Sequence, residues 1–146
     1  MNGINMKISI EYGIEHLDWV EVCEIIRLAP LGTRNPDKLR LAAKNSHTVC
    51  SAFVNGKLVG FGRSISDGQY QSAIYDIVVL PEFQSQGIGS AIMNALLEKL
   101  PKRTTVLIFV APGKQAFYQK FGFGNLKTGM GLFPNPEMSK SKGYLE

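Results

Sequence analysis

Apolar and polar residues follow one another in patterns that predict strands and helices along the first third of the chain. Strict alternation over residues 7–13 predicts a first strand. Apolar residues then recur at helical spacing over residues 17–28, and Pro30 ends that helix because proline breaks the backbone ladder. Asn35-Pro36 supplies the cap and the first residue of a second, short helix.

The middle of the chain predicts three antiparallel strands. Residues 48–54 are rich in β-favouring side chains and are followed by Asn55-Gly56, a pair that favours a tight hairpin turn. Residues 57–65 therefore return as a second strand. A turn around Asp67-Gly68 leads to a third strand over residues 72–80.

The remaining pattern predicts a helix, a strand, a short helix and a final pair of strands. Residues 87–100 place their apolar side chains on one helical face, and residues 106–111 read as a short apolar strand buried on both faces. A short helix is expected over residues 114–121. The last two strands are expected from Phe123 onwards and over residues 130–133.

This order predicts one α/β domain of mixed α+β type. An antiparallel meander leads into one βαβ crossover, which gives a mixed, mostly antiparallel sheet with helices on both faces. The 146 residues contain no internal repeat and no long linker, so a single domain spans residues 1–146. The polar residues 134–146 are expected to be a loosely held tail.

Composition and charge exclude several classes of protein. The net charge of +4 favours anionic ligands, but the basic residues are scattered and do not alternate with aromatic residues as in a nucleic-acid-binding surface. Cys23 and Cys50 lack metal-ligand spacing and are expected to be buried thiols, so no metal is predicted. No signal-peptide block and no membrane-length apolar run are present, so a cytoplasmic protein without membrane contact is expected.

The most informative segment is the loop Gln84-Ser85-Gln86-Gly87-Ile88-Gly89-Ser90, between a predicted strand and a predicted helix. The first N–H groups of a helix have no partner within the helix, and the helix dipole adds positive potential there. Gly87 and Gly89 allow a diphosphate to approach the backbone closely. The alternative is a glycine-rich turn that only connects strand and helix. A P-loop and a Rossmann fingerprint both lack required residues.

Two segments resemble the GNAT superfamily of N-acetyltransferases. Residues 75–90 are similar to the family's central motif, in which Gln84, Gly87 and Gly89 match the pattern Gln/Arg-x-x-Gly-x-Gly/Ala. Residues 117–123, Phe-Tyr-Gln-Lys-Phe-Gly-Phe, resemble its second signature. The two motifs occur in the family's order, and the resemblance covers residues 48–123.

The resemblance implies that acetyl-CoA is the co-substrate. The main chain of three strand residues is then expected to pair with the pantetheine arm, and the loop to hold the pyrophosphate. The expected cofactor-binding residues are Ile77, Val78, Val79, Gln84, Ser85, Gln86, Gly87, Ile88, Gly89 and Ser90. Many family members carry Asn where Ala111 stands, and alanine lacks the side-chain amide with which such an Asn contacts pantetheine.

The resemblance also implies two catalytic residues. Tyr118 is similar to the family's general acid, which protonates the departing thiolate; a packed helix tyrosine is the alternative. Asp76 stands where family members often contact the incoming amine, and a structural salt bridge is the alternative. Arg34 is a candidate for an acceptor carboxylate, or else a solvated loop arginine.

The expected activity is transfer of an acetyl group from acetyl-CoA to the primary amine of a small molecule, of amino acid, polyamine or arylalkylamine type. Acetylation of a protein N-terminus or lysine and a non-catalytic CoA-binding module are the alternatives. Dimers are frequent among similar enzymes, so a homodimer stays an open option.

Overall fold

The computed structural model describes residues 6–146 and divides into two compact units, Met1–Ile108 and Phe109–Glu146. Each unit is described by itself below. Residues 1–5, part of the segment expected to lack a signal peptide, lie outside the described residues.

The sheet of the first unit begins with the predicted meander. Strands β1 (Ile8–Tyr12), β2 (Thr48–Val54), β3 (Lys57–Ser66) and β4 (Gln71–Val79) pair in sequence order, each antiparallel to the next. Asn55 and Gly56 join β2 to β3 with φ angles of 50° and 80°, the left-handed conformation of a tight hairpin turn. The predicted meander is therefore confirmed.

One crossover completes the sheet. From β4 the chain passes through the 3₁₀ turn η1 (Pro81–Phe83) and helix α3 (Ile88–Lys99) to the short strand β5 (Thr105–Leu107). β5 pairs with β4 in parallel, from Gln71↔Thr105 to Ala73↔Leu107. The mixed, mostly antiparallel five-stranded sheet agrees with the prediction.

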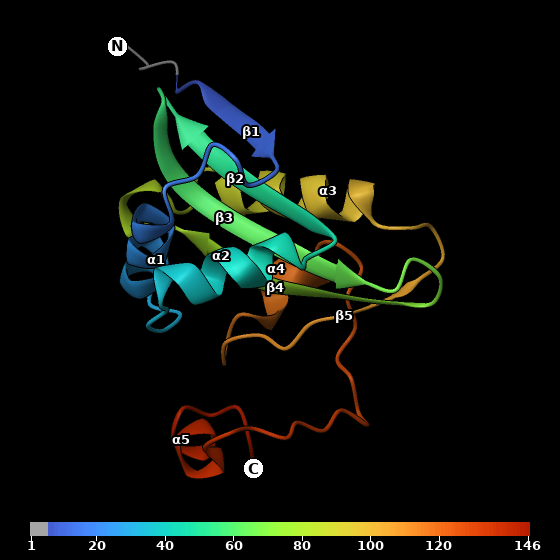
Figure 1. Ribbon diagram of the computed structural model, residues 1–146. Helices are drawn as coiled ribbons and strands as arrows, with labels where there is room; N and C mark the ends of the chain where they lie inside the picture. Colours follow the sequence, from blue (N-terminus) through green and yellow to red (C-terminus); the bar gives the residue numbers. More distant parts are fainter. Residues whose placement is uncertain (1–5) are drawn as a thin grey trace. The chain divides into compact units, whose positions relative to one another are not determined.

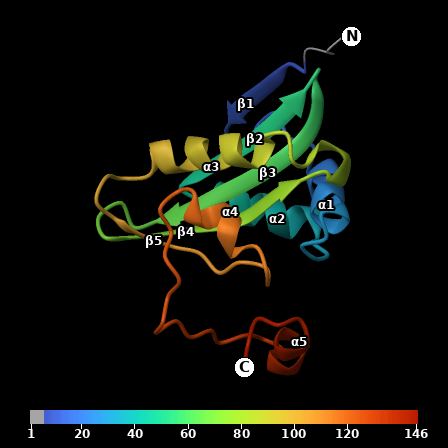
Figure 2. The same cartoon turned by 180° about the vertical axis from the view of Figure 1, so that it is seen from behind.

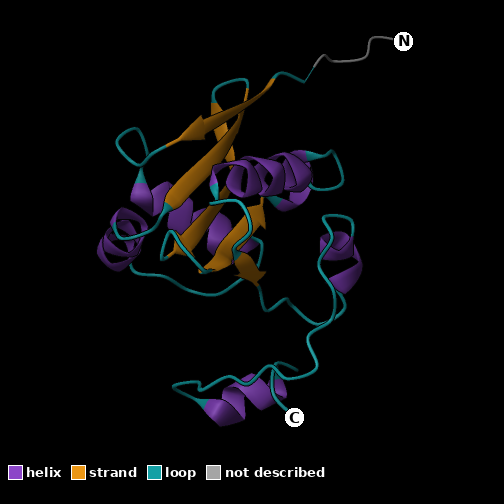
Figure 3. Ribbon diagram, turned by 90° about the vertical axis from the view of Figure 1, so that its right-hand side faces the viewer, coloured by secondary structure: helices purple, strands orange, loops and turns teal. Residues whose placement is uncertain are grey.

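Helices cover both faces of this sheet, as Figure 1 and the reverse view in Figure 2 show. Helices α1 (Trp19–Leu28) and α2 (Pro36–Lys44) lie on one face, and α3 lies on the other. Asp18 and Asn35 cap the first two helices through their side chains, and the Asn35 cap was predicted. The helix–sheet–helix layering can be followed from the side in Figure 3.

The second unit contains two short helices and an aromatic cluster. Helix α4 (Gln115–Gln119) contains the first residues of the second signature, and helix α5 (Pro136–Ser141) forms within the segment expected to be a loose tail. The ring of Phe109 meets those of Phe133 and Tyr144 edge-to-face, at centroid distances of 5.8 and 5.6 Å. These contacts join the start of the unit to its last residues.

Two sequence predictions about strands are wrong. The strand predicted over residues 106–111 is shorter, with β5 at the edge of the sheet, and it is not buried on both faces, because both Thr105 and Leu107 are exposed. No strand forms between Phe123 and Phe133 in the described chain. Met130 and Leu132 alternate with glycines, and both side chains are fully exposed because no partner strand covers them in the described chain.

Candidate active site

The glycine loop places uncapped backbone donors at the start of α3. Gly87 is the N-cap residue with φ of 85°, and no side chain among residues 6–146 caps this helix. A Cβ at Gly87 would meet no heavy atom within 4 Å, so the space beside this residue is open. The first N–H groups of the helix thus have room for an anion, as the charge distribution at a helix N-terminus favours.

The side chains of the loop hold its shape. Nε2 of Gln84 donates a hydrogen bond to the Val79 carbonyl at 3.0 Å, which ties the loop to the end of β4. Nε2 of Gln86 donates to the Glu82 carbonyl at 3.4 Å, and Ile88 is buried in the core. Gln84, expected from the resemblance to bind cofactor, therefore uses its amide to position the loop.

β4 runs past the end of its pairing with β5. The β4–β5 ladder stops at Ala73, whereas the ladder to β3 on the other side continues to Val79. In the described part of the chain no ladder covers the β5-facing edge of Ile77, Val78 and Val79. The side chains of Val78 and Val79 are buried. The side chains of Val78 and Val79 therefore pack in the core. The main chain of residues 77–79 forms the edge of β4 that β5 does not reach.

A bulge interrupts β4 just before that edge. Tyr75 lies opposite Arg63 and Val78 opposite Phe61, so Asp76 and Ile77 together face the single residue Gly62. Asp76 adopts a left-handed φ of 58°, which Asp tolerates better than most residues. A Cβ at Gly62 would lie 2.6 Å from Cδ1 of Ile77, so this glycine makes room for the bulged strand.

The bulge brings Asp76 between two arginines. Nε of Arg63 donates to Oδ2 of Asp76 at 2.7 Å, and Nη2 of Arg34 donates to Oδ1 at 3.3 Å. The Asp76 side chain is 6% exposed, against 16% for Arg63 and 37% for Arg34. Both carboxylate oxygens thus accept a hydrogen bond from an arginine. The two arginines together carry two positive charges, against the single negative charge of Asp76.

Arg63 was missed at the sequence level. It also donates through Nη1 to Oγ of Ser46 at 3.3 Å and lies over the Tyr75 ring at 5.5 Å. The length of the turn decides this meeting, because Ser66 pairs with Ser72 and Arg63 therefore lies opposite Tyr75, beside Asp76. A two-residue turn at Asp67-Gly68 would place residue 63 opposite residue 72 instead, so the local sequence pattern did not reveal Arg63.

Tyr118 lies in α4 of the second unit among aromatic rings. Its ring meets Phe117 at 4.9 Å and Phe123 at 6.3 Å, both edge-to-face. Burial, and to a smaller extent the neighbouring Tyr144, raises the pKa of the Tyr118 phenol above its ordinary value of 10.0. The hydroxyl therefore keeps its proton at neutral pH, as a general acid requires.

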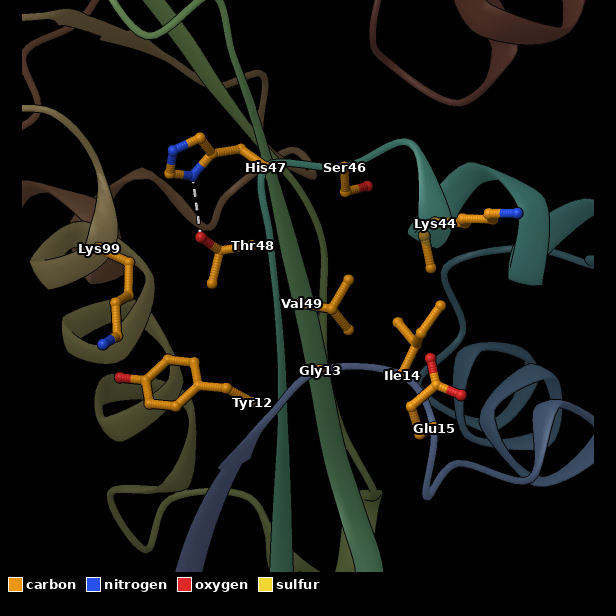
Figure 4. Close-up of a pocket in the computed structure, with 11 residues that line it drawn as sticks. Tyr12, Gly13, Ile14, Glu15, Lys44, Ser46, His47, Thr48, Val49 and Lys99 are labelled. Atoms are coloured by element: carbon orange, nitrogen blue, oxygen red, sulfur yellow. Dashed lines mark hydrogen bonds between the residues drawn. The ribbon is translucent and has the colours of Figure 1, made fainter.

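A shallow depression of about 470 Å³ lies elsewhere in the first unit (Figure 4). It is lined by residues at the end of β1, the start of β2 and the last residue of α3, so it lies at the opposite end of that helix from the glycine loop. Two pairs of its lining residues are in contact: Nζ of Lys99 lies 4.8 Å from the Tyr12 ring centroid, and Nδ1 of His47 lies 2.9 Å from Oγ1 of Thr48. The depression is therefore separate from the candidate site.

In residues 6–146 no cluster of three or more His, Cys, Asp or Glu side chains is placed to hold a metal ion. The same part of the chain contains no helix with the length and apolar character needed to span a membrane.

The sequence of the chain matches a known protein family. The pattern of the acetyltransferase (GNAT) family matches residues 15–123, a range that contains both the glycine loop and Tyr118. The chain belongs to the GNAT family. Acetyl-CoA is the typical co-substrate of these enzymes, and the resemblance drawn from the sequence is confirmed.

Three relatives illustrate the match. The uncharacterized N-acetyltransferase ycf52 of Pyropia yezoensis is 36% identical over 92 residues, 59% of this chain and 53% of its own. Serotonin N-acetyltransferase 2, chloroplastic, of Oryza sativa subsp. japonica is 27% identical over 113 residues, 73% of this chain and 56% of its own. The solved GNAT family protein SP0256 of Streptococcus pneumoniae is 26% identical, with a TM-score of 0.74 over 87% of this chain and 96% of its own. The chain spans about half the length of the two curated relatives.

Proposed function

We propose that this GNAT protein transfers the acetyl group of acetyl-CoA to the primary amine of a small molecule. The proposal rests on one observation, the nearness of two features in the chain. The first is the uncapped start of α3, with open space at Gly87, and the second is the edge of β4 beyond Ala73, where the ladder to β5 has ended. The first feature suits a pyrophosphate and the second suits the amide groups of a pantetheine arm.

The cofactor contacts follow from these two features. Backbone N–H groups of Ser85–Ser90 bind the pyrophosphate, and the main chain of Ile77, Val78 and Val79 binds the pantetheine arm. Gln84 holds the loop against β4 through its bond to the Val79 carbonyl. This arrangement orients the thioester without any metal ion.

Tyr118 is the proposed general acid. The acceptor nitrogen attacks the thioester carbonyl, a C–N bond forms and the C–S bond breaks. The leaving thiolate takes the phenolic proton of Tyr118, the nitrogen loses a proton to solvent, and Tyr118 takes a proton back from solvent before the next turnover. Burial raises the pKa of Tyr118, so the phenol carries the proton that this role requires at neutral pH.

We assign Asp76 to the acceptor side, but as a residue that positions arginines and not as a base that binds ammonium. Its carboxylate is held by Arg63 and Arg34, so it positions these arginines and has little negative charge left to attract a free ammonium group. The acceptor amine is therefore expected to lose its proton through water. Arg34 is proposed to contact the acceptor.

The test is thiol release from acetyl-CoA in the presence of amino acids, polyamines, arylalkylamines and peptides with free N-termini or lysines. A small amine should be acetylated, and Tyr118→Phe should lower kcat by about 100-fold or more. Tyr70→Phe is the matched control, because Tyr70 is 76% exposed. Turnover of peptides alone would indicate protein acetylation, and acetyl-CoA binding without any turnover would indicate a non-catalytic module.

The compartment and the oligomeric state belong to the same proposal. We place the protein in the cytoplasm, supported by two cysteines that form no disulfide. The rice relative is named chloroplastic, so a plastid is the alternative. A homodimer is the oligomer to test by light scattering.

A further inference from the structure

The cluster of Asp76, Arg34 and Arg63, assigned above to the acceptor side, has unbalanced charge. Arg34 and Arg63 together contribute two positive charges, and Asp76 contributes one negative charge that both arginines share. A bare ammonium group brought to this cluster would meet a net positive charge. An anionic group would be attracted, so the cluster selects for negative charge on whatever binds beside it.

The two arginines differ in how many of their N–H donors remain available to a ligand. Arg63 is mostly buried and engages Asp76, Ser46 and the Tyr75 ring. Arg34 is 37% exposed, and Asp76 is its only hydrogen-bond partner among residues 6–146. A guanidinium carries five N–H donors, so Arg34 retains enough of them for a bidentate contact.

The loop between α1 and α2 holds Arg34 in place. A Cβ on Gly32 would lie 2.9 Å from Nη1 of Arg34, so the guanidinium rests directly against this glycine, whose φ is 140°. Asp76 holds the other side of the group at 3.3 Å. The side chain is thus oriented before any ligand arrives, which lowers the entropy cost of binding.

We propose that the acceptor amine carries an anionic group, a carboxylate or a phosphate, and that Arg34 binds it. This inference rests on the acetyltransferase function proposed above and narrows its substrate class. Amino acids and phosphorylated amines fit the class. Polyamines and simple arylalkylamines lack the anionic group and are disfavoured.

The experiment compares matched acceptors that differ in the anionic group. The pairs are phenylalanine with phenylalaninamide, tryptophan with tryptamine, glutamate with its amides, and phosphoethanolamine with ethanolamine. We expect kcat/KM to be at least tenfold higher for the anionic member of the preferred pair. The pair that shows the preference tells carboxylate from phosphate.

Variants assign the preference to Arg34. Arg34→Gln should abolish it, and Arg34→Lys, which keeps the charge but loses the bidentate geometry, should retain part of it. Arg40→Gln, an exposed arginine of α2, is the matched control and should leave it intact. The KM for acetyl-CoA should change less than twofold in all three, and thermal unfolding should verify that each variant is folded.

A binding measurement separates this inference from the proposed function. With CoA present, calorimetry should give at least tenfold tighter binding of N-acetylphenylalanine or N-acetyltryptophan than of the corresponding acetylated amines, and Arg34→Gln should remove the difference. If no amine is turned over, the acetyltransferase proposal fails while this titration still decides the inference. A preference for uncharged acceptors, or one that survives Arg34→Gln, would overturn it.

Discussion

The glycine loop and the β4 bulge lie within ten residues of each other, yet they handle charge in opposite ways. The loop offers backbone donors at a helix start that no side chain caps, and its own side chains only hold its shape. The bulge buries a carboxylate and surrounds it with two guanidiniums, from residues 13 and 42 positions away in sequence.

This difference shows how each site is specified. A backbone site needs only glycines at the right places between a strand and a helix, so its information is local. A side-chain cluster needs three distant residues to be brought together by the sheet register and by the α1–α2 loop. The first is tolerant of side-chain changes outside its glycines, whereas the second depends on the balance of its charges.

Removing the charge of Asp76 should give the largest effect, a loss of stability at the bulge that leaves cofactor binding at the loop nearly unchanged. Asp76→Asn keeps a residue that tolerates the left-handed conformation but leaves the partly buried Arg63 without its counter-charge. The free energy of unfolding should fall by about 2 kcal/mol, below the cost for a fully buried pair because Arg34 is exposed. Urea unfolding measures this, and acetyl-CoA affinity should change less than threefold.

A double-mutant cycle sharpens that result. Coupling of Asp76→Asn with Arg63→Gln should exceed coupling with Arg34→Gln, because the Arg63 bond is shorter and more buried. Equal couplings would show that the two arginines share the carboxylate evenly, which contradicts the roles given to them here.

Gly87→Ala should produce the next largest effect, on cofactor binding. The Cβ would enter the open space in front of the helix start, so acetyl-CoA affinity should fall about tenfold. Gly68→Ala is the matched control, because Gly68 has a similar φ of 78° and equally open surroundings in the β3–β4 turn. Both variants should lose about 1 kcal/mol of stability from the left-handed strain. Equal acetyl-CoA affinities in the two variants would refute the role of the loop.

Gln84→Ala should give the smallest effect of the three. It removes the bond that ties the loop to the Val79 carbonyl, a contribution of about 1 kcal/mol, so acetyl-CoA affinity should fall about threefold to fivefold. Gln86→Ala, which removes a longer and more exposed bond, should have less effect. Isothermal titration calorimetry distinguishes the two, and the reverse order would contradict the positioning role of Gln84.

The sequence predicted those strands and helices whose limits are set by residues close to them in the chain. The limits of β2 agree residue for residue because Asn55-Gly56 fixes one end, and α3 begins one residue from its predicted start. Asn35 caps α2 as expected from its position before Pro36. Alternation and turn chemistry suffice where an element's partners are its neighbours in sequence.

Prediction failed where long-range partners decide. The alternation at Met130 and Leu132 suggested a strand, but a strand also needs a partner, and none is paired with this segment in the described chain. Arg34 was named as a candidate because a guanidinium can bind an acceptor carboxylate in bidentate geometry. Its meeting with Asp76 depends on the fold of the α1–α2 loop, which no local pattern reveals.

The central claim is that backbone N–H groups of Ser85–Ser90 bind the cofactor's pyrophosphate. An amide NMR titration of the uniformly ¹⁵N-labelled protein with acetyl-CoA tests it directly. The account predicts that the resonances of Gly87, Ile88 and Gly89 shift the most and follow one saturation curve, because hydrogen bonds to an anion move amide protons strongly. Unshifted loop amides at saturating acetyl-CoA would contradict the account.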